Sequence, residues 1–127
     1  MYGGKMSVEN QIVHIELAAA NLEAAGSFYS DVFGWKVEQM PALNYATFES
    51  PEGLGGGFAK VDGQMYKTGT VVAYIQTSDL EGKLKSITAA GGKVVLPRQE
   101  IPQMGWFALF TDPSGTMVGL FTDKAPK

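Results

Sequence analysis

Two side chains able to transfer protons lie two residues apart near the start of the chain. His14 is the only histidine in 127 residues, and Glu16 follows it in a segment that alternates apolar and polar positions. This alternation puts the imidazole and the carboxylate on one face of a strand. A carboxylate beside an imidazole can hold one tautomer and raise the imidazole pKa, giving a general acid or base near neutral pH. The alternative is a buried histidine that an acidic neighbour satisfies without chemistry.

Further residues have the types that a small-molecule pocket needs. A tyrosine and a glutamine in a second alternating segment match the positions of the first, and we expect the four polar side chains to form a hydrogen-bonding floor. Two later strands offer a methionine and three aromatic residues as apolar walls, with the core as the alternative for each aromatic residue. The predicted ligand-binding residues are His14, Glu16, Tyr74, Gln76, Trp106, Phe110, Met117 and Phe121.

The elements that must position these residues occur twice. A capping residue, an apolar helix and a glycine stop run from Asn21 to Gly34 and again from Asp79 to Gly92. Each helix follows an alternating strand and precedes three short strand candidates, so the repeat predicts two modules of one α+β fold. The expected architecture is two tandem βαβββ modules that form an eight-stranded cleft. The strand candidates are 12–17, 36–40, 45–49 and 54–59, then 71–76, 93–96, 106–111 and 116–121.

The repeat also sets the expected domain limits. Residues 10–123 are predicted to form a single domain, with module one at about 10–62 and module two at about 69–123. Residues 1–9 have the composition of a flexible leader. The proline-bounded stretch 97–104 is interpreted as a hairpin-like excursion.

Composition and charge narrow the classes of partner. A hydrophobic content of 45% and a charged content of 18% are ordinary for a globular domain that buries a core. The formal net charge of −3 argues against a nucleic-acid partner, and no apolar run is long enough to predict membrane insertion. Cysteine is absent, which excludes disulfides and thiol nucleophiles and favours a cytoplasmic location.

Three motifs at fixed separations resemble one known superfamily. These are Phe33–Trp35 after the first helix, Gly105–Ala108 in a late strand and the turn Asp112–Gly115. With the repeat, they make about Gln11–Asp123 similar to the vicinal oxygen chelate superfamily, which includes glyoxalase I, extradiol dioxygenases and bleomycin-resistance proteins. The resemblance implies paired βαβββ modules around a cleft, and a homodimer.

The resemblance further implies up to four metal ligands, from the first and last strands of each module. Matched by position, they fall at His14, Gly57, Val72 and Gly119. Glycine and valine offer no side-chain donor, so we expect no metal cofactor and no glyoxalase I activity. The alternative is a metal held by His14 with waters, substrate atoms and Glu16 in place of the missing donors.

The leading hypothesis is a metal-free glyoxalase-like protein that binds a small, partly apolar organic molecule in the inter-module cleft. Sequestration of the bleomycin-resistance type is one version of it. The alternative is a metal-dependent or His/Glu-dependent lyase, isomerase or dioxygenase of the superfamily, and a third class is an interaction module without a small-molecule role. Arg98 is the only arginine in the sequence. It either binds an anionic group of a ligand through both sides of its guanidinium or is a solvated surface charge.

Overall fold

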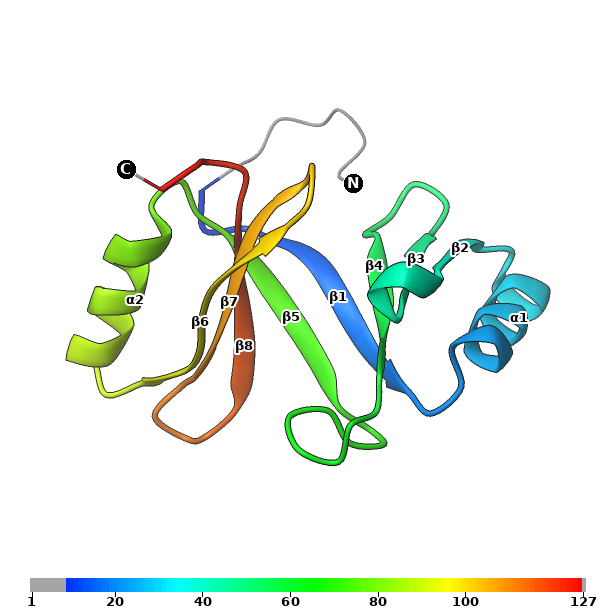
Figure 1. Cartoon of the computed structure of the whole chain (residues 1–127), viewed down its shortest axis with the longest axis horizontal. Helices are drawn as coiled ribbons and strands as arrows, with labels where there is room; N and C mark the ends of the chain where they lie inside the picture. Colours follow the sequence, from blue (N-terminus) through cyan, green and yellow to red (C-terminus); the bar gives the residue numbers. More distant parts are fainter. Residues whose placement is uncertain (1–8, 127) are drawn as a thin grey trace. The chain divides into compact units, whose positions relative to one another are not determined.

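The computed structural model describes residues 9–126, which divide between two compact units (Figure 1). The first unit is His14–Val72, and the second comprises residues 9–13 and 73–126 of the described chain. Within the described residues, each unit packs one helix against one face of a mixed sheet. The predicted α+β fold built from two βαβββ modules is confirmed.

The sheet of the first unit has the order β2-β3-β4-β1. Its β2/β3 and β3/β4 pairs are antiparallel, and β4 pairs parallel with β1. The parallel pair is possible because a helix and two strands separate the two partners along the chain. The elements are β1 (Ile12–Ala19), α1 (Leu22–Phe33), β2 (Lys36–Met40), the short 3₁₀ helix η1 (Pro41–Leu43), β3 (Tyr45–Glu49) and β4 (Gly56–Lys60).

Helix α1 begins and ends where its capping residues predict. Asn21 Oδ1 accepts a hydrogen bond from the Ala24 backbone N–H at 2.9 Å, and Gly34 ends the helix in the left-handed region at φ 72°. The helix covers an aromatic core in which Trp35 stacks on both Tyr29 and Phe48, with ring centroids 5.0 and 4.4 Å apart. Phe58, with 1% of its surface exposed, completes this core.

The second unit repeats the arrangement with the order β5-β8-β7-β6. Strand β5 pairs parallel with β8, and β8/β7 and β7/β6 are antiparallel. Helix α2 covers a core of Leu80, Ala108, Phe110 and Leu120, which is mainly aliphatic. The elements are β5 (Val71–Gln76), α2 (Leu80–Ala89), β6 (Lys93–Ile101), β7 (Gly105–Thr111) and β8 (Met117–Thr122).

The stretch interpreted as an excursion is largely strand. β6 continues through Pro97 to Ile101, and its pairing with β7 shifts register twice, between Val94 and Leu96 and between Leu96 and Gln99. Pro97 is tolerated because β6 lies at the edge of the sheet, where a missing N–H leaves no neighbouring strand unpaired.

Glu9, placed at the end of the predicted leader, makes hydrogen bonds within the second unit. Its carboxylate accepts from Thr77 Oγ1 at 2.8 Å and from the Ser78 backbone N–H at 2.7 Å. These bonds join the chain before β1 to the segment that precedes α2. Residues 1–8 of the predicted leader lie outside the described residues.

Candidate functional site

The polar face of β1 is the more deeply buried of its two faces. His14 is 4% exposed and Glu16 8% exposed, whereas Val13, Ile15 and Leu17 are half-buried. Leu17 faces the aromatic core under α1. His14 and Glu16 therefore project from the side of the sheet opposite α1, on one face as predicted.

Two tyrosines join His14 and Glu16 into one cluster within the first unit. Tyr45, from β3, donates its phenol proton to Glu16 Oε2 at 2.9 Å, and its oxygen lies 2.9 Å from His14 Nε2. Tyr66 donates to the other carboxylate oxygen, Oε1, at 2.5 Å. We call His14, Glu16, Tyr45 and Tyr66 the polar cluster.

Tyr66 comes from an ordered turn in the connection between β4 and β5. Asp62 Oδ1 accepts hydrogen bonds from the backbone N–H groups of Gln64 and Tyr66, at 2.8 and 2.9 Å. These two hydrogen bonds, of which the one from Tyr66 has the larger effect, hold the pKa of the Asp62 carboxyl below its ordinary value. The turn thus fixes the backbone from which the Tyr66 phenol reaches Glu16.

A glycine makes room for the Tyr45 ring. Gly57 pairs with Glu16 across β4 and β1, and a Cβ built on Gly57 would overlap the Tyr45 phenol. Gly57 is also the position at which the superfamily resemblance implies a ligand carboxylate. In this chain a tyrosine from the neighbouring strand fills the space that such a side chain would need.

The pKa of His14 shifts opposite to the direction expected from its neighbour Glu16. Burial disfavours the charged imidazolium and lowers the pKa from 6.5 to about 4. The expectation of a raised pKa was wrong because the imidazole lies out of water, which disfavours its charged form. Its Nε2 lies 2.9 Å from the Tyr45 phenol oxygen. The imidazole is neutral at neutral pH.

The second unit places its predicted polar residues on the sheet face away from α2. Tyr74 and Gln76 are 4% and 3% exposed, and Gln76 Oε1 accepts no hydrogen bond from the residues that the structure describes. Tyr74 pairs with Gly119 across β5 and β8, and a Cβ on Gly119 would overlap the Tyr74 ring. A tyrosine thus covers the last-strand glycine in each unit.

Strand register resolves where the predicted apolar residues lie. Phe121 pairs with Gln76, so it shares the face of Tyr74, and Met117 lies on that face by alternation. Phe110 packs in the core under α2. Trp106 lies on the α2 side by alternation, with the Arg98 guanidinium 5.4 Å from its ring centroid. The structure therefore separates Trp106 and Phe110 from the other predicted ligand-binding residues of this unit.

The side chains present do not fit the metal centre that the superfamily pattern implies. His14 contributes one imidazole whose Nε2 is engaged with Tyr45, Val72 is an apolar side chain with 1% exposure, and the two glycine positions are covered by phenol rings. Among residues 9–126 there is no group of three or more His, Cys, Asp and Glu side chains arranged to hold a metal ion. A divalent cation requires several such donors converging on it.

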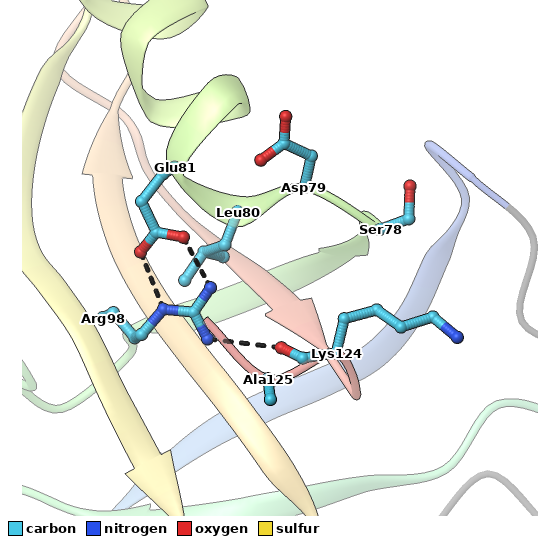
Figure 2. A pocket seen from close by; sticks show the side chains of 7 residues that line it. All are labelled: Ser78, Asp79, Leu80, Glu81, Arg98, Lys124 and Ala125. Carbon is cyan, nitrogen blue, oxygen red and sulfur yellow. Dashed lines mark hydrogen bonds and ion pairs between the residues drawn. The ribbon is translucent and has the colours of Figure 1, made fainter. Parts of the chain in front are cut away.

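Arg98 makes an ion pair within the second unit. Its Nε and Nη2 donate to the two carboxylate oxygens of Glu81 at 2.7 and 2.6 Å, beside a pocket of about 190 Å³ at the start of α2 (Figure 2). Hydrogen bonding from Arg98 lowers the pKa of Glu81. The guanidinium charge is thus already paired with a carboxylate, which argues against the hypothesis that Arg98 binds an anionic ligand group.

Tyr45 and Tyr66 are the site residues that sequence reasoning missed. Tyr45 pairs with Ala59, and it reaches Gly57 and Glu16 only because β3 pairs antiparallel with β4 in this register. Tyr66 lies in a connection without periodicity, 50 residues from its carboxylate partner. The glycine at the ligand position was the available hint, since a strand glycine often marks the close approach of another group.

Comparison with known proteins places the chain in a family. The model for the Glyoxalase/Bleomycin resistance protein/Dioxygenase superfamily matches residues 11–120. The chain belongs to this superfamily. The resemblance drawn from the sequence motifs is thereby confirmed.

Individual relatives of the superfamily differ in length. A glyoxylase-like domain-containing protein from Didymella fabae is 32% identical over 126 residues, covering 92% of this chain and 97% of that protein. Anthracycline biosynthesis protein DauV from Streptomyces sp. (strain C5) is 27% identical over 116 residues, covering 79% of this chain but 42% of DauV. The chain thus spans less than half the length of DauV.

A solved structure shares the fold. The crystal structure of methylmalonyl-CoA epimerase from Mycobacterium tuberculosis superposes with a TM-score of 0.71 and 16% identity, covering 95% of this chain and 93% of that one. At this identity the likeness shows the fold alone. Among residues 9–126, no helix has the length and apolar character needed to cross a membrane.

Proposed function

We propose that this superfamily member binds a small, partly apolar organic molecule at the polar cluster without a metal ion. The observation that carries the proposal is the convergence of two phenols on the Glu16 carboxylate, one of which also contacts the His14 imidazole. These groups come from β1, β3 and the connection after β4. Ligand sites of this kind combine a few placed polar groups with apolar surroundings. Sequestration of the bleomycin-resistance type is one form that such binding takes.

Relatives and donor chemistry support this proposal. DauV is named for anthracycline biosynthesis, which agrees with an organic small molecule as the ligand. The four positions at which the superfamily pattern implies metal ligands hold one imidazole, one valine and two glycines. We therefore propose that the ligand is bound by hydrogen bonds and apolar contact rather than by coordination.

Ligand screening in the presence of a chelator tests the proposal. We expect members of a broad panel of aromatic and aliphatic carbonyl, hydroxyl and amide compounds to raise the melting temperature in EDTA, with calorimetry giving the affinity. Tyr45→Phe should weaken the binding of such a compound by about tenfold, because a buried hydrogen-bonding partner is lost. Tyr29→Phe is the matched control, since Tyr29 belongs to α1 and packs against the aromatic core on the opposite face of the sheet. If no compound of the panel raises the melting temperature, the proposal is wrong.

A second candidate is a lyase, isomerase or dioxygenase that depends on His14 and Glu16 or on a metal. The neutral imidazole in contact with a phenol that also binds a carboxylate favours a proton-transfer form of this candidate. Elemental analysis of untagged protein separates the two functions. Near-stoichiometric zinc, nickel, manganese or iron would contradict metal-free binding.

We also propose a homodimer in the cytoplasm. Helix α1 exposes Phe28, Val32 and Phe33 to 55, 59 and 54%, although it belongs to a folded unit. In α2 the exposed residues are mostly polar, among them Glu81, Lys85 and Thr88. Light scattering after gel filtration should give twice the monomer mass, and Phe28→Lys should shift it toward the 13.6 kDa monomer. An unchanged mass in that variant contradicts an interface on α1.

A further inference from the structure

The connection between β4 and β5 is a loop whose two ends are anchored next to each other on β1. The Val61 backbone N–H donates to the Ala19 carbonyl at 3.0 Å, and the Ala18 N–H donates to the Thr70 carbonyl, also at 3.0 Å. Since Ala18 and Ala19 are consecutive, the loop leaves the sheet and returns to it at one place. Compact surface loops with such close ends are frequently functional. We call residues 61–70 the β4–β5 loop.

Hydrogen bonds inside the β4–β5 loop hold it together as two turns. Asp62 Oδ1 accepts from the Tyr66 N–H, and the Tyr66 carbonyl accepts from the Asp62 N–H, both at 2.9 Å. In the second turn, Lys67 N–H donates to Thr70 Oγ1 at 3.0 Å, and Thr70 N–H donates to the Lys67 carbonyl at 2.9 Å. These bonds join loop residues to one another, so the loop can keep them when it moves about its anchors.

Tyr66 attaches the β4–β5 loop to the polar cluster. Residues 62–65 and 67–69 are exposed, whereas Tyr66 is half-buried and donates its phenol proton to Glu16 Oε1 at 2.5 Å. Glu16 is 8% exposed, so a molecule that replaces the phenol at Oε1 requires the loop to move. Such a movement breaks the Tyr66–Glu16 hydrogen bond, but it need not break the bonds at the anchors or within the loop.

We propose that the β4–β5 loop is a lid over the polar cluster, which opens when Tyr66 releases Glu16 and the loop swings about its anchors. Gly69 lies beside the Thr70 anchor at φ 93°, and glycine has the backbone freedom that a hinge needs. A Cβ built on Gly69 would meet no atom within 4 Å, so there is open space around this end of the loop. Opening is a property of the protein alone, whereas its role in admitting a small molecule rests on the proposed function.

The only histidine of the chain reports access to the polar cluster without any ligand. His14 is 4% exposed, and diethyl pyrocarbonate modifies neutral imidazoles that it can reach, which ultraviolet absorbance follows. We expect His14 of the full chain to react at a rate that low urea concentrations hardly change, because opening of a lid exposes little surface. A rate that rises steeply with urea, or no reaction of the folded protein, overturns the lid, whether or not any variant folds.

A tyrosine variant then tests the attachment of the lid. Tyr66→Phe removes one hydrogen bond of the closed loop and should raise the rate of His14 modification about fivefold, still with little dependence on urea. Tyr29→Phe is the matched control, because it removes the same hydroxyl group from α1 and should leave the rate unchanged. An unchanged rate in Tyr66→Phe, or an equal rise in both variants, overturns the role of Tyr66.

Two variants of Asp62 test whether the internal turn holds Tyr66 in place. Asp62→Ala removes the side-chain acceptor and should raise the rate of His14 modification, because the loop no longer holds the Tyr66 backbone. Asp62→Asn keeps an Oδ1 acceptor and should react at the wild-type rate. Equal rates in Asp62→Ala and the wild type would show that the loop does not move as one body.

The same reaction separates failure of the lid from failure of the proposed function. A compound of the screening panel that binds at the polar cluster should slow the modification of His14, because it occupies the space that the reagent enters. Binding without any slowing overturns the role of the lid in admitting that compound. If no compound binds, the proposed function is wrong, and the urea dependence and the Tyr66→Phe rate still decide whether the lid exists.

Discussion

The two units place a tyrosine over a glycine of their last strand, but each takes it from a different neighbour. In the first unit Tyr45 reaches Gly57 from β3, the antiparallel partner of β4. In the second unit Tyr74 reaches Gly119 from β5, the parallel partner of β8. The phenol from β3 joins an imidazole and a carboxylate, whereas Tyr74 lies against Phe107, with ring centroids 6.3 Å apart.

This difference shows how a duplicated fold acquires unequal halves. The backbone pairing is repeated, so each unit offers a sheet face away from its helix and a glycine on the last strand. The residues that fill this face are free to differ, because the core that stabilises each unit lies on the other side, under the helix. Hydrogen-bonding groups dominate the cluster in the first unit, and apolar surface is more prominent on the corresponding face of the second.

The largest expected effect comes from truncating the two helix-side cores. Phe58→Ala should lower the free energy of unfolding by about 4 kcal/mol and Leu80→Ala by about 3 kcal/mol, because each removes a fully buried side chain. Phe58 should cost more, since it also loses contacts with the Tyr29 and Phe48 rings. Urea denaturation measures both values. A larger loss in Leu80→Ala would contradict the greater contribution of the aromatic core.

Adding a methyl group to the covered glycines is the next most disruptive change. Gly119→Ala should cost about 3 kcal/mol and Gly57→Ala about 2 kcal/mol, as is typical of overpacked sites. Gly119→Ala should cost more because its Cβ would meet the Tyr74 ring close to that residue's backbone, where the ring has little room to turn. The Cβ of Gly57 would meet the hydroxyl end of Tyr45, which can swing aside if it gives up its hydrogen bonds. Adding Tyr45→Ala to Gly57→Ala should relieve the clash. If the loss of unfolding free energy in the double variant equalled the sum of the losses in the two single variants, Tyr45 would not occupy the space above Gly57.

Burial of His14 predicts a pH dependence confined to the first unit. Its pKa is about 4 in the folded protein and 6.5 when unperturbed, so the unfolded chain binds a proton at higher pH. The contribution is therefore complete above pH 6.5 and is lost as the pH falls toward 4, with about 2 kcal/mol already lost near pH 5. Denaturation of the wild type and His14→Asn across this range isolates the effect from the carboxylates. If the free energy of unfolding changed with pH in the same way in both proteins, that result would contradict a buried, neutral imidazole.

The smallest effect is expected for the ion pair of the second unit. Arg98→Met with Glu81→Gln should change the free energy of unfolding by about 0.5 kcal/mol, because Glu81 is largely exposed and water screens the pair. The same variants should leave ligand binding at the polar cluster unchanged. A double-mutant cycle at low and high salt measures the coupling between the two side chains. A loss of ligand affinity would instead favour the hypothesis that Arg98 binds an anionic group of the ligand.

Local patterns predicted much of the fold. Alternation and helical spacing located both helices and all eight strands of the described chain, and Asn21 and Asp79 cap the helices as expected. The main error was the stretch after Pro97, because two register shifts keep β6 paired where a proline suggested a break. Such a shift depends on the partner strand, which local sequence does not specify.

The candidate site was less predictable. His14 and Glu16 were found because they lie two residues apart on one strand, and such spacing fixes a shared face. Burial of that face, however, depends on segments that come together only on folding. Trp106 and Phe110 looked equivalent to Phe121 in the sequence, and only the pairing of β7 with β8 assigns them to opposite sides of the sheet.

By itself the sequence determined the duplication, the family and the loss of ligand side chains at Gly57, Val72 and Gly119, because these are properties of residue identity and spacing. Tertiary structure alone decided what stands in their place. Tyr45 and Tyr66 lie 29 and 50 residues from Glu16 along the chain, and strand register and an ordered turn bring their phenols to its carboxylate. Hydrogen bonds at these separations depend on long-range pairing, which no local pattern records.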